Sequence, residues 1–273
     1  MIDISENISL KSYNTFGIDV KARHFVSVES IDSLKSVLFS DSYPNKFILG
    51  GGSNLLLTKD IDALVIHNNL KGIEIVSKNS ETVRVKAAAG ENWHSFVLWC
   101  LNNDFGGIEN LSLIPGKLGT APIQNIGAYG VELKDVFISC EALDIQSQKH
   151  RTFTKADCQF DYRYSIFKGE DKGRYVITSV TLELTSTNHK LKTTYGAISQ
   201  QLESSGIENP SIQDISNAVI KIRQSKLPDP AIIGNSGSFF KNPVVSLEKY
   251  QRLVKNFPDL PFYKVSENHY KIP

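Results

Sequence analysis

The chain has 273 residues, of which 41% are hydrophobic and 22% charged, a composition typical of a globular protein of about two domains. Thirty basic residues balance twenty-nine acidic ones, which argues against the strongly basic face of a nucleic-acid-binding protein. The sequence contains no apolar run as long as the eighteen or so residues of a membrane-spanning helix. We therefore expect a cytoplasmic protein without nucleic-acid or membrane partners.

Cysteine and histidine usage predicts neither a disulfide framework nor a metal centre. The three cysteines, Cys100, Cys140 and Cys158, are odd in number and widely spaced, so they are expected to be reduced residues of a core. The six histidines show no spacing typical of zinc ligands. No metal is predicted.

In chain order, the first hundred residues alternate between short strands and two helices. Ser30 precedes apolar residues at helical spacing and is predicted to cap a helix that runs to Phe39. A second helix, rich in apolar residues, is predicted at 91–103, just before Gly106 and Gly107. Short strands are predicted at residues 24–28, 46–49, 63–67, 73–76 and 82–88.

Residues 108–130 interrupt this pattern with glycine, proline and small residues in no clear period. Aperiodic stretches of this length are uncommon in compact domains and usually functional. Strands are predicted after it, at 136–145 and 175–185, and Ser211 with Asp214 predicts a capping box that opens a helix. A last helix is predicted at 246–256. The pattern indicates a strand-rich α+β domain to about residue 186 and a smaller region from about residue 205.

Three glycines follow the predicted strand at 46–49, in the sequence Gly50-Gly51-Gly52-Ser53-Asn54. Glycines let the backbone turn sharply and bring its N–H groups close to an anion such as a pyrophosphate. A tight turn between two strands is an equally good interpretation of this segment alone. A Rossmann fold is not predicted, because the spacing is not G-x-G-x-x-G and no helix follows.

The aperiodic segment includes Gly116-Lys117, but it is not a P-loop, because Leu111 replaces the first glycine and Leu118 the Ser/Thr. Its small residues and the amides of Gln124 and Asn125 are suited to enclosing a flat polar ring. Further along, Arg163 lies among aromatic residues, where a partly exposed strand is the simpler interpretation. Residues 234–243 lack the last glycine of a nucleophile elbow, so a serine hydrolase is not predicted.

Together, four segments in this order resemble the UDP-N-acetylenolpyruvoylglucosamine reductase (MurB) family, in the first of its two subtypes: GGGSNLL, APIQNIGAYG, YR-x-SIFK and KLPDP…GSFFKNP. The resemblance runs from Asn14 to the C-terminus. It implies an α+β fold with a vanillyl-alcohol-oxidase/PCMH-type FAD-binding domain of two lobes, at 1–69 and 70–204. An incomplete substrate-binding domain would follow at 205–273.

The resemblance implies non-covalent FAD, with NADPH as hydride donor and UDP-N-acetylglucosamine enolpyruvate as substrate. The product would be UDP-N-acetylmuramate, a precursor of peptidoglycan. In family members the protein supplies position and charge while the flavin supplies the redox chemistry. The implied cofactor contacts are Gly50, Gly51, Gly52, Ser53, Asn54, Leu55, Pro115, Gly116, Gly119, Ala121, Gln124, Asn125, Gly127, Ala128, Tyr129 and Gly130.

By the same resemblance, Arg163 matches the arginine that stabilises the negative charge developing on the substrate, and Ser238 matches the serine that donates the proton. The implied contacts to the UDP-sugar are Tyr162, Tyr195, Lys226 and Asn242. For Tyr162 a packing role is equally open.

Two departures from the family pattern bear on activity. Lys117 and Leu118 stand where a smaller pair is expected, and the sequence ends before a segment that carries a catalytic glutamate. We therefore expect a truncated chain that binds FAD but turns over roughly 10²–10³-fold more slowly. The alternatives are a catalytically impaired FAD- and UDP-sugar-binding protein, or another flavin oxidoreductase of the same fold. A monomer is the default expectation.

Overall fold

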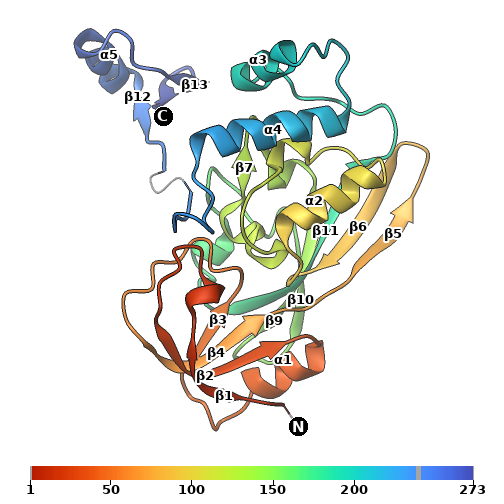
Figure 1. The fold of residues 1–273 in the computed structure, drawn as a ribbon, viewed down its shortest axis with the longest axis vertical. Coiled ribbons are helices and arrows are strands. Elements are labelled where there is room, and N and C mark those ends of the chain that lie inside the picture. The colour runs from red at the N-terminus through yellow and green to blue at the C-terminus, as the bar shows by residue number, and fades with distance from the viewer. Residues whose placement is uncertain (1, 238–240, 273) are drawn as a thin grey trace. The chain divides into compact units, whose positions relative to one another are not determined.

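The computed structural model describes residues 2–237 and 241–272. The chain divides into two compact units, Met1–Ser236 and Gly237–Pro273. Figure 1 shows two separate sheets within the first unit, with helices packed against them.

The first sheet has the order β1-β2-β4-β3, with β2 parallel to β4, β4 parallel to β3, and β1 antiparallel to β2. Its central strand β2 is buried on both faces: Val26 packs in the core beneath α1, and Phe25 packs in a second core on the other side. Helix α1 begins where Ser30 accepts a hydrogen bond from the Ser33 N–H, as predicted. The elements are β1 (Ser5–Ser9), β2 (Lys21–Val28), α1 (Ile31–Leu38), β3 (Lys46–Leu49) and β4 (Ile61–Asn68).

The second sheet is antiparallel throughout, in the order β10-β9-β11-β6-β5. Helix α2 covers it: Trp93 and Phe96, both almost fully buried, share one core with Val85 and Leu182 of the sheet. The elements are β5 (Ile73–Lys78), β6 (Thr82–Ala88), α2 (Trp93–Asn102), β9 (Phe137–Asp144), β10 (His150–Thr154) and β11 (Tyr175–Thr185).

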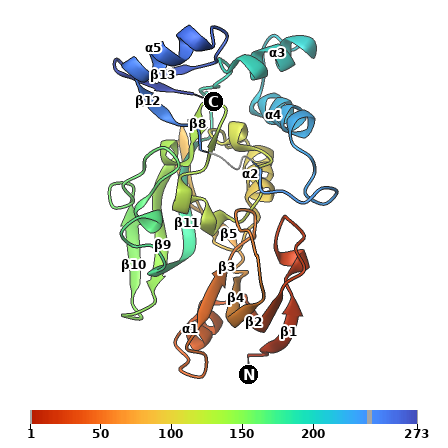
Figure 2. The same cartoon turned by 90° about the vertical axis from the view of Figure 1, so that its left-hand side faces the viewer.

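The two sheets are joined by apolar packing and by a buried amide. Leu143 of β9 and Val176 of β11 belong to the same core as α1 and β4. The buried Asn68, the last residue of β4, donates its Nδ2–H to the Ile177 carbonyl at 2.9 Å. The end of β4 therefore lies at the junction of the sheets, which Figure 2 shows from the side.

The aperiodic stretch after α2 folds into short 3-10 turns and one two-strand ribbon, and it is largely buried. Its backbone is held from within, because the Trp93 Nε1–H donates to the Leu111 carbonyl at 2.8 Å. Two helices, α3 and α4, pack on each other beyond it through Ile198, Ile215 and Val219. The elements are β7 (Gly127–Ala128), β8 (Val131–Glu132), α3 (Gly196–Ser204) and α4 (Ile212–Lys226).

The second unit is a three-stranded sheet, β12-β14-β13, with one helix. Ser246 accepts a hydrogen bond from the Lys249 N–H and begins α5. The ring of Tyr250 in α5 stacks on Tyr270 of β14, with centroids 4.0 Å apart. The elements are β12 (Val244–Ser246), α5 (Leu247–Asn256), β13 (Tyr263–Ser266) and β14 (His269–Lys271).

Most predicted elements are confirmed, including the capping box of Ser211 and Asp214 that opens α4. In the described part of the first unit, five strands and α-helices have no predicted counterpart: the strands β1, β7, β8 and β10 and the helix α3. β1 and β10 are edge strands that are mostly exposed, so no alternation of apolar and polar residues marks them in the sequence. β7 and β8 have only two residues each, too short for a periodic pattern.

Candidate functional site

The glycine loop Gly50–Asn54 leaves the end of β3 and packs tightly on two other backbone segments. Gly52 has a φ of +60°, and a Cβ at this position would overlap the Tyr13 carbonyl oxygen. A Cβ at Gly51 would come within 2.8 Å of the Gly116 Cα. Only glycine fits both positions, so the sequence Gly-Gly-Gly allows this loop to pack directly against the backbone at Tyr13 and at Gly116.

The N–H groups of this loop point to no acceptor in the described part of the chain. Among the residues that the structure describes, none accepts a hydrogen bond from the backbone N–H of Gly51, Gly52, Ser53 or Asn54. Consecutive open N–H groups in a turn with a left-handed residue form a concave donor set for a phosphate oxygen. The donors present therefore fit the pyrophosphate of the FAD that the sequence implies, and we call residues 50–54 the anion cradle.

A short segment near the N-terminus connects the anion cradle to the end of the first unit. The Thr15 N–H donates to the Gly52 carbonyl at 3.2 Å, and the Asn235 N–H donates to the Thr15 carbonyl at 3.0 Å. The Thr15 hydroxyl oxygen is buried and has no hydrogen-bond partner among the described residues. Thr15 therefore holds the cradle on one side and the chain before Gly237 on the other.

The structure brings together the first two motifs of the sequence, which lie about sixty residues apart. The Ser53 hydroxyl donates to the Pro115 carbonyl at 3.1 Å, and Asn54 Nδ2 donates to Gln124 Oε1 at 3.0 Å. Residues 113–130, which we call the site loop, thus form one wall of the anion cradle.

The site loop begins at a strained residue held from two helices. Leu113 has a φ of +57°, a left-handed conformation that costs a non-glycine residue about 1–2 kcal/mol. Its N–H donates to His94 Nδ1 of α2 at 3.0 Å, and its carbonyl accepts from Arg223 Nε of α4 at 3.2 Å. Burial, and then the positive charge of Arg223, lower the pKa of His94, which keeps the ring neutral and able to accept.

Asn125 is fully buried and uses its amide within the protein. Its Nδ2 donates to Glu132 Oε2 and to the Asp161 carbonyl, both at 3.1 Å, and its Oδ1 accepts from the Lys134 N–H at 3.0 Å. With a φ of +43°, this residue fixes the turn at the middle of the site loop. Its side chain shapes the loop instead of reaching outward.

Arg163 lies against the turn that Asn125 forms. Its Nη1 donates to the Asn125 carbonyl at 3.3 Å and its Nη2 to the Gly127 carbonyl. Arg163 is half-buried, and no carboxylate in the described part of the chain lies within ion-pair distance of it. A half-buried cation whose hydrogen-bond partners are neutral carbonyl groups can attract an anionic ligand.

A second group of side chains lies where the site loop meets α3 and α4. The rings of Tyr129 and Tyr195 contact edge to face, with centroids 5.4 Å apart. Burial raises the pKa of Tyr129 and lowers that of Arg223. Lys226, the exposed last residue of α4, lies one turn beyond Arg223.

Some predicted residues lie elsewhere or outside this description. Ser238 lies outside the described residues, and Asn242 belongs to the second unit. The Arg163 guanidinium lies 5.3 Å from the ring centroid of Tyr162. The remaining predicted contacts lie in or beside the two loops: Leu55, Gly119, Ala121, Ala128 and Gly130.

Sequence reasoning did not find Arg223 or His94. Arg223 lies three positions before Lys226, so the helical repeat places both on one face of α4; that spacing was the available signal. His94 offered none, because its role depends on contact with Leu113, nineteen residues away.

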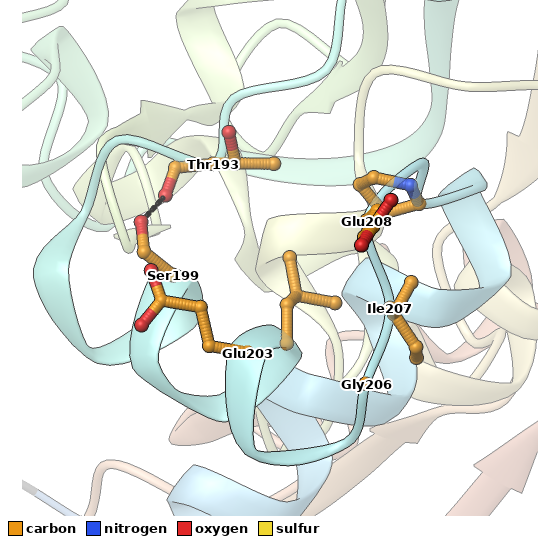
Figure 3. A pocket seen from close by; sticks show the side chains of 8 residues that line it. Thr193, Ser199, Glu203, Gly206, Ile207 and Glu208 are labelled. Atoms are coloured by element: carbon orange, nitrogen blue, oxygen red, sulfur yellow. Dashed lines mark hydrogen bonds between the residues drawn. The ribbon is translucent and has the colours of Figure 1, made fainter.

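A separate pocket of about 530 Å³ lies between α3 and the turn that follows it (Figure 3). Leu202 and Ile207 contribute apolar surface, and the carboxylates of Glu203 and Glu208 line opposite sides. Two carboxylates disfavour a pyrophosphate by like-charge repulsion, so this pocket is not a candidate for the nucleotide.

No helix in the described ranges is long and apolar enough to cross a membrane.

Comparison with solved structures shows the fold. MurB from Thermus caldophilus superposes with a TM-score of 0.64 at 20% identity, over 100% of this chain and 88% of that one. A solvent-stable cholesterol oxidase superposes with a TM-score of 0.51 at 18% identity, over 68% of this chain and 38% of that one. The α+β fold of an FAD-binding protein, expected from the sequence, is confirmed.

Comparison of sequences shows the family. A family model described as an FAD binding domain matches residues 22–152. The UDP-N-acetylenolpyruvoylglucosamine reductase of Flavobacterium johnsoniae is 56% identical, over 100% of this chain and 81% of its own length. That of Amoebophilus asiaticus is 48% identical, over 100% of this chain and 80% of its own. The protein therefore belongs to the UDP-N-acetylenolpyruvoylglucosamine reductase family of FAD-dependent oxidoreductases.

Proposed function

We propose that this protein is a UDP-N-acetylmuramate dehydrogenase of peptidoglycan precursor synthesis, which uses NADPH and FAD. Its substrate is the enolpyruvyl ether of UDP-N-acetylglucosamine, and the product is the corresponding lactyl ether. FAD, when bound, supplies the hydride transfer between NADPH and the substrate. The protein's own residues supply binding, charge and a proton.

The observation that carries this proposal is the meeting of the anion cradle, the site loop and Arg163. Open N–H groups at Gly51–Asn54 are suited to the cofactor's pyrophosphate. The site loop packs on them through Ser53 and Asn54, and it carries the Arg163 guanidinium on its carbonyl groups. The proposed phosphate-binding turn and the half-buried arginine therefore contact the same loop.

Arg163 is assigned to the charge that develops on the enolpyruvyl group. Hydride addition to its methylene carbon leaves negative charge on the adjacent carbon and on its carboxylate. A guanidinium is always charged and presents a planar fork that matches a carboxylate. Holding it on loop carbonyls in advance lowers the reorganisation that the reaction needs.

Ser238 is assigned as the donor of the proton that completes the reduction. A serine hydroxyl is a weak acid in water, so this role requires contact with a strongly basic carbon. Tyr162, Tyr195, Lys226 and Asn242 are assigned to the UDP-sugar. The ammonium of Lys226, exposed at the end of α4, can neutralise a phosphate charge.

An anaerobic flavin spectrum tests the proposal in two steps. NADPH should bleach the visible flavin band of the purified protein, and enolpyruvyl-UDP-N-acetylglucosamine should then restore it. UDP-N-acetylglucosamine without the enolpyruvyl group is the control and should leave the band bleached. Failure of NADPH to bleach the flavin would contradict the assigned donor; bleaching without recovery would contradict the assigned substrate.

A further inference from the structure

Lys117 is the first residue of the site loop whose side chain reaches back to the first sheet. Its ammonium lies 2.7 Å from His67 Nε2, 2.8 Å from the Asn68 carbonyl oxygen and 3.1 Å from Asn69 Oδ1. An ammonium has three N–H donors and no acceptor. The three contacts therefore use its whole hydrogen-bonding capacity, and all three acceptors belong to the end of β4 or the residue after it.

The partner histidine is held in one tautomer. Because the ammonium can only donate, His67 Nε2 must accept, so Nδ1 carries the proton and donates to the Ser27 hydroxyl, 3.0 Å away. The His67 ring also packs against Phe25 and Tyr13, with centroids 6.1 Å and 5.1 Å apart. Burial, and then the charge of Lys117, lower the pKa of His67 to about 4, consistent with a neutral ring.

The backbone of Lys117 lies directly beside the anion cradle. Its backbone nitrogen and the Gly116 Cα lie 3.2 Å and 2.8 Å from where a Cβ on Gly51 would be. The Lys117 carbonyl accepts from the Thr120 N–H and hydroxyl, which fixes the turn that follows. The same residue therefore touches the cradle with its backbone and anchors to β4 with its side chain.

We propose that Lys117 is a positioning residue for FAD: by tying the site loop to the end of β4, it sets the spacing between Gly51 and Gly116 that closes the anion cradle. This inference rests on the proposed placement of the cofactor pyrophosphate at residues 50–54. The ammonium acts on the cradle through the loop and does not itself contact the cradle.

The proposal is tested by comparing the FAD affinities of the wild-type and Lys117→Met apoproteins, measured by flavin fluorescence. The methionine keeps the apolar stem of the side chain and removes its three N–H donors. The FAD dissociation constant should rise about tenfold, the effect expected of one net charge-assisted hydrogen bond. Lys172→Met, which removes an exposed lysine elsewhere, is the matched control and should leave the constant within about twofold. An unchanged constant in Lys117→Met overturns the proposal.

A double-mutant cycle separates the anchor from general damage. His67→Phe keeps an aromatic ring against Phe25 and removes the acceptor; combined with Lys117→Met it should weaken FAD binding little more than either change alone. If the two single-variant losses of FAD affinity add up in the double variant, the proposed anchoring contact between Lys117 and His67 is wrong. If Lys117→Met does not fold, Asn69→Ala is the second variant, because it removes only one of the three acceptors. It should weaken FAD binding about threefold. An unchanged FAD affinity in this variant would contradict the proposal.

One further variant distinguishes this inference from the proposed site itself. Gly51→Val introduces side-chain atoms where Gly116 and Lys117 now lie. If it binds FAD like the wild type, the cofactor does not occupy the cradle, and both the placement and the Lys117 inference are wrong. If it loses FAD while Lys117→Met does not, only the Lys117 inference is wrong.

Discussion

The anion cradle and the site loop lie against each other, yet their polar groups have different partners. In the cradle, the N–H groups of residues 51–54 have no acceptor within the described chain. In the site loop, Asn125 satisfies all its amide contacts inside the protein, and Leu113 is held from both sides. The short loop offers its donors to a ligand, whereas the long one uses its hydrogen bonds to hold an unfavourable shape.

The two loops also differ in how their backbone conformations are fixed. Leu113, Asn125, Tyr129 and Arg163 all have positive φ values although none is glycine, and such residues persist only when their surroundings enforce them. The site loop and the arginine on it are therefore held in advance of binding. The cradle is shaped differently, because its glycines pack directly against the backbone of Tyr13 and Gly116 without any side chain.

The largest expected effect comes from closing the cradle. Gly52→Ala would place a Cβ on the Tyr13 carbonyl oxygen, so we expect the FAD dissociation constant to rise about 100-fold or more, about 3 kcal/mol. Gly173→Ala is the matched control, since Gly173 also has a positive φ, +76°, with no neighbour within 4 Å of a Cβ. It should cost about 1–2 kcal/mol of stability and leave FAD affinity unchanged. If the two variants bind FAD with equal affinity, residues 50–54 are not part of the FAD-binding site.

A substitution of Arg163, which is held by the site loop, tests whether this residue contributes to the reaction or to cofactor binding. Arg163→Met should lower the rate of substrate-dependent flavin reoxidation by about 10²–10³-fold, because the guanidinium is proposed to stabilise the negative charge of the transition state. FAD affinity should change less than about threefold. Lys172→Met, which removes an exposed lysine outside this motif, should be close to wild type in both measurements. A loss of FAD affinity as large as the loss of rate would mean that Arg163 holds the cofactor.

Two asparagines sharpen the contrast between the loops. Asn125→Ala leaves the Lys134 N–H and the Asp161 carbonyl without their buried partner, and should lower the free energy of unfolding by about 1–3 kcal/mol. Asn54→Ala removes one exposed hydrogen bond to Gln124 and should cost less than about 1 kcal/mol. Denaturant unfolding of the two apoproteins makes the comparison, and the reverse order would contradict the internal role of the Asn125 amide.

The smallest effect is the pH dependence contributed by His94. Its pKa in the folded protein lies below the ordinary value of 6.5, so the unfolded chain binds more protons as the pH falls below 6.5. The free energy of unfolding therefore decreases through this window. His94→Asn keeps an acceptor for the Leu113 N–H but does not titrate, so its stability should fall less between pH 7 and pH 5 than that of the wild type. An identical decrease would show that His94 does not contribute.

Three strands of the first unit are predicted with the same bounds that the structure gives them. β3, β6 and β11 begin and end at the predicted residues, because their apolar residues are bounded by turn residues. α3 carries only Ile198 and Leu202 as buried apolar side chains, too few to mark a helical stripe. Burial alone does not set the strength of the signal, because α5 was predicted almost to its bounds although it has no buried side chain.

For the candidate site, local sequence predicts the parts but not their contacts. The glycines of the cradle and the aperiodic site loop are visible because special backbone conformations require particular residue types. That Lys117 reaches His67, or that Arg223 reaches Leu113, depends on segments 50 to 110 residues apart. Such pairs follow from the packing of the two sheets and helices, which no local pattern encodes.

The packing of Tyr13 and Thr15 on Gly52 has a practical consequence for dissecting the protein. The FAD-binding family model begins at residue 22, after this segment, so a fragment cut to the matched range would keep every cradle glycine and lose the backbone that supports them. On the proposed placement of the cofactor, the boundary of the matched domain and the boundary of the binding site are different. A minimal FAD-binding fragment of this chain would then have to keep the residues before β2.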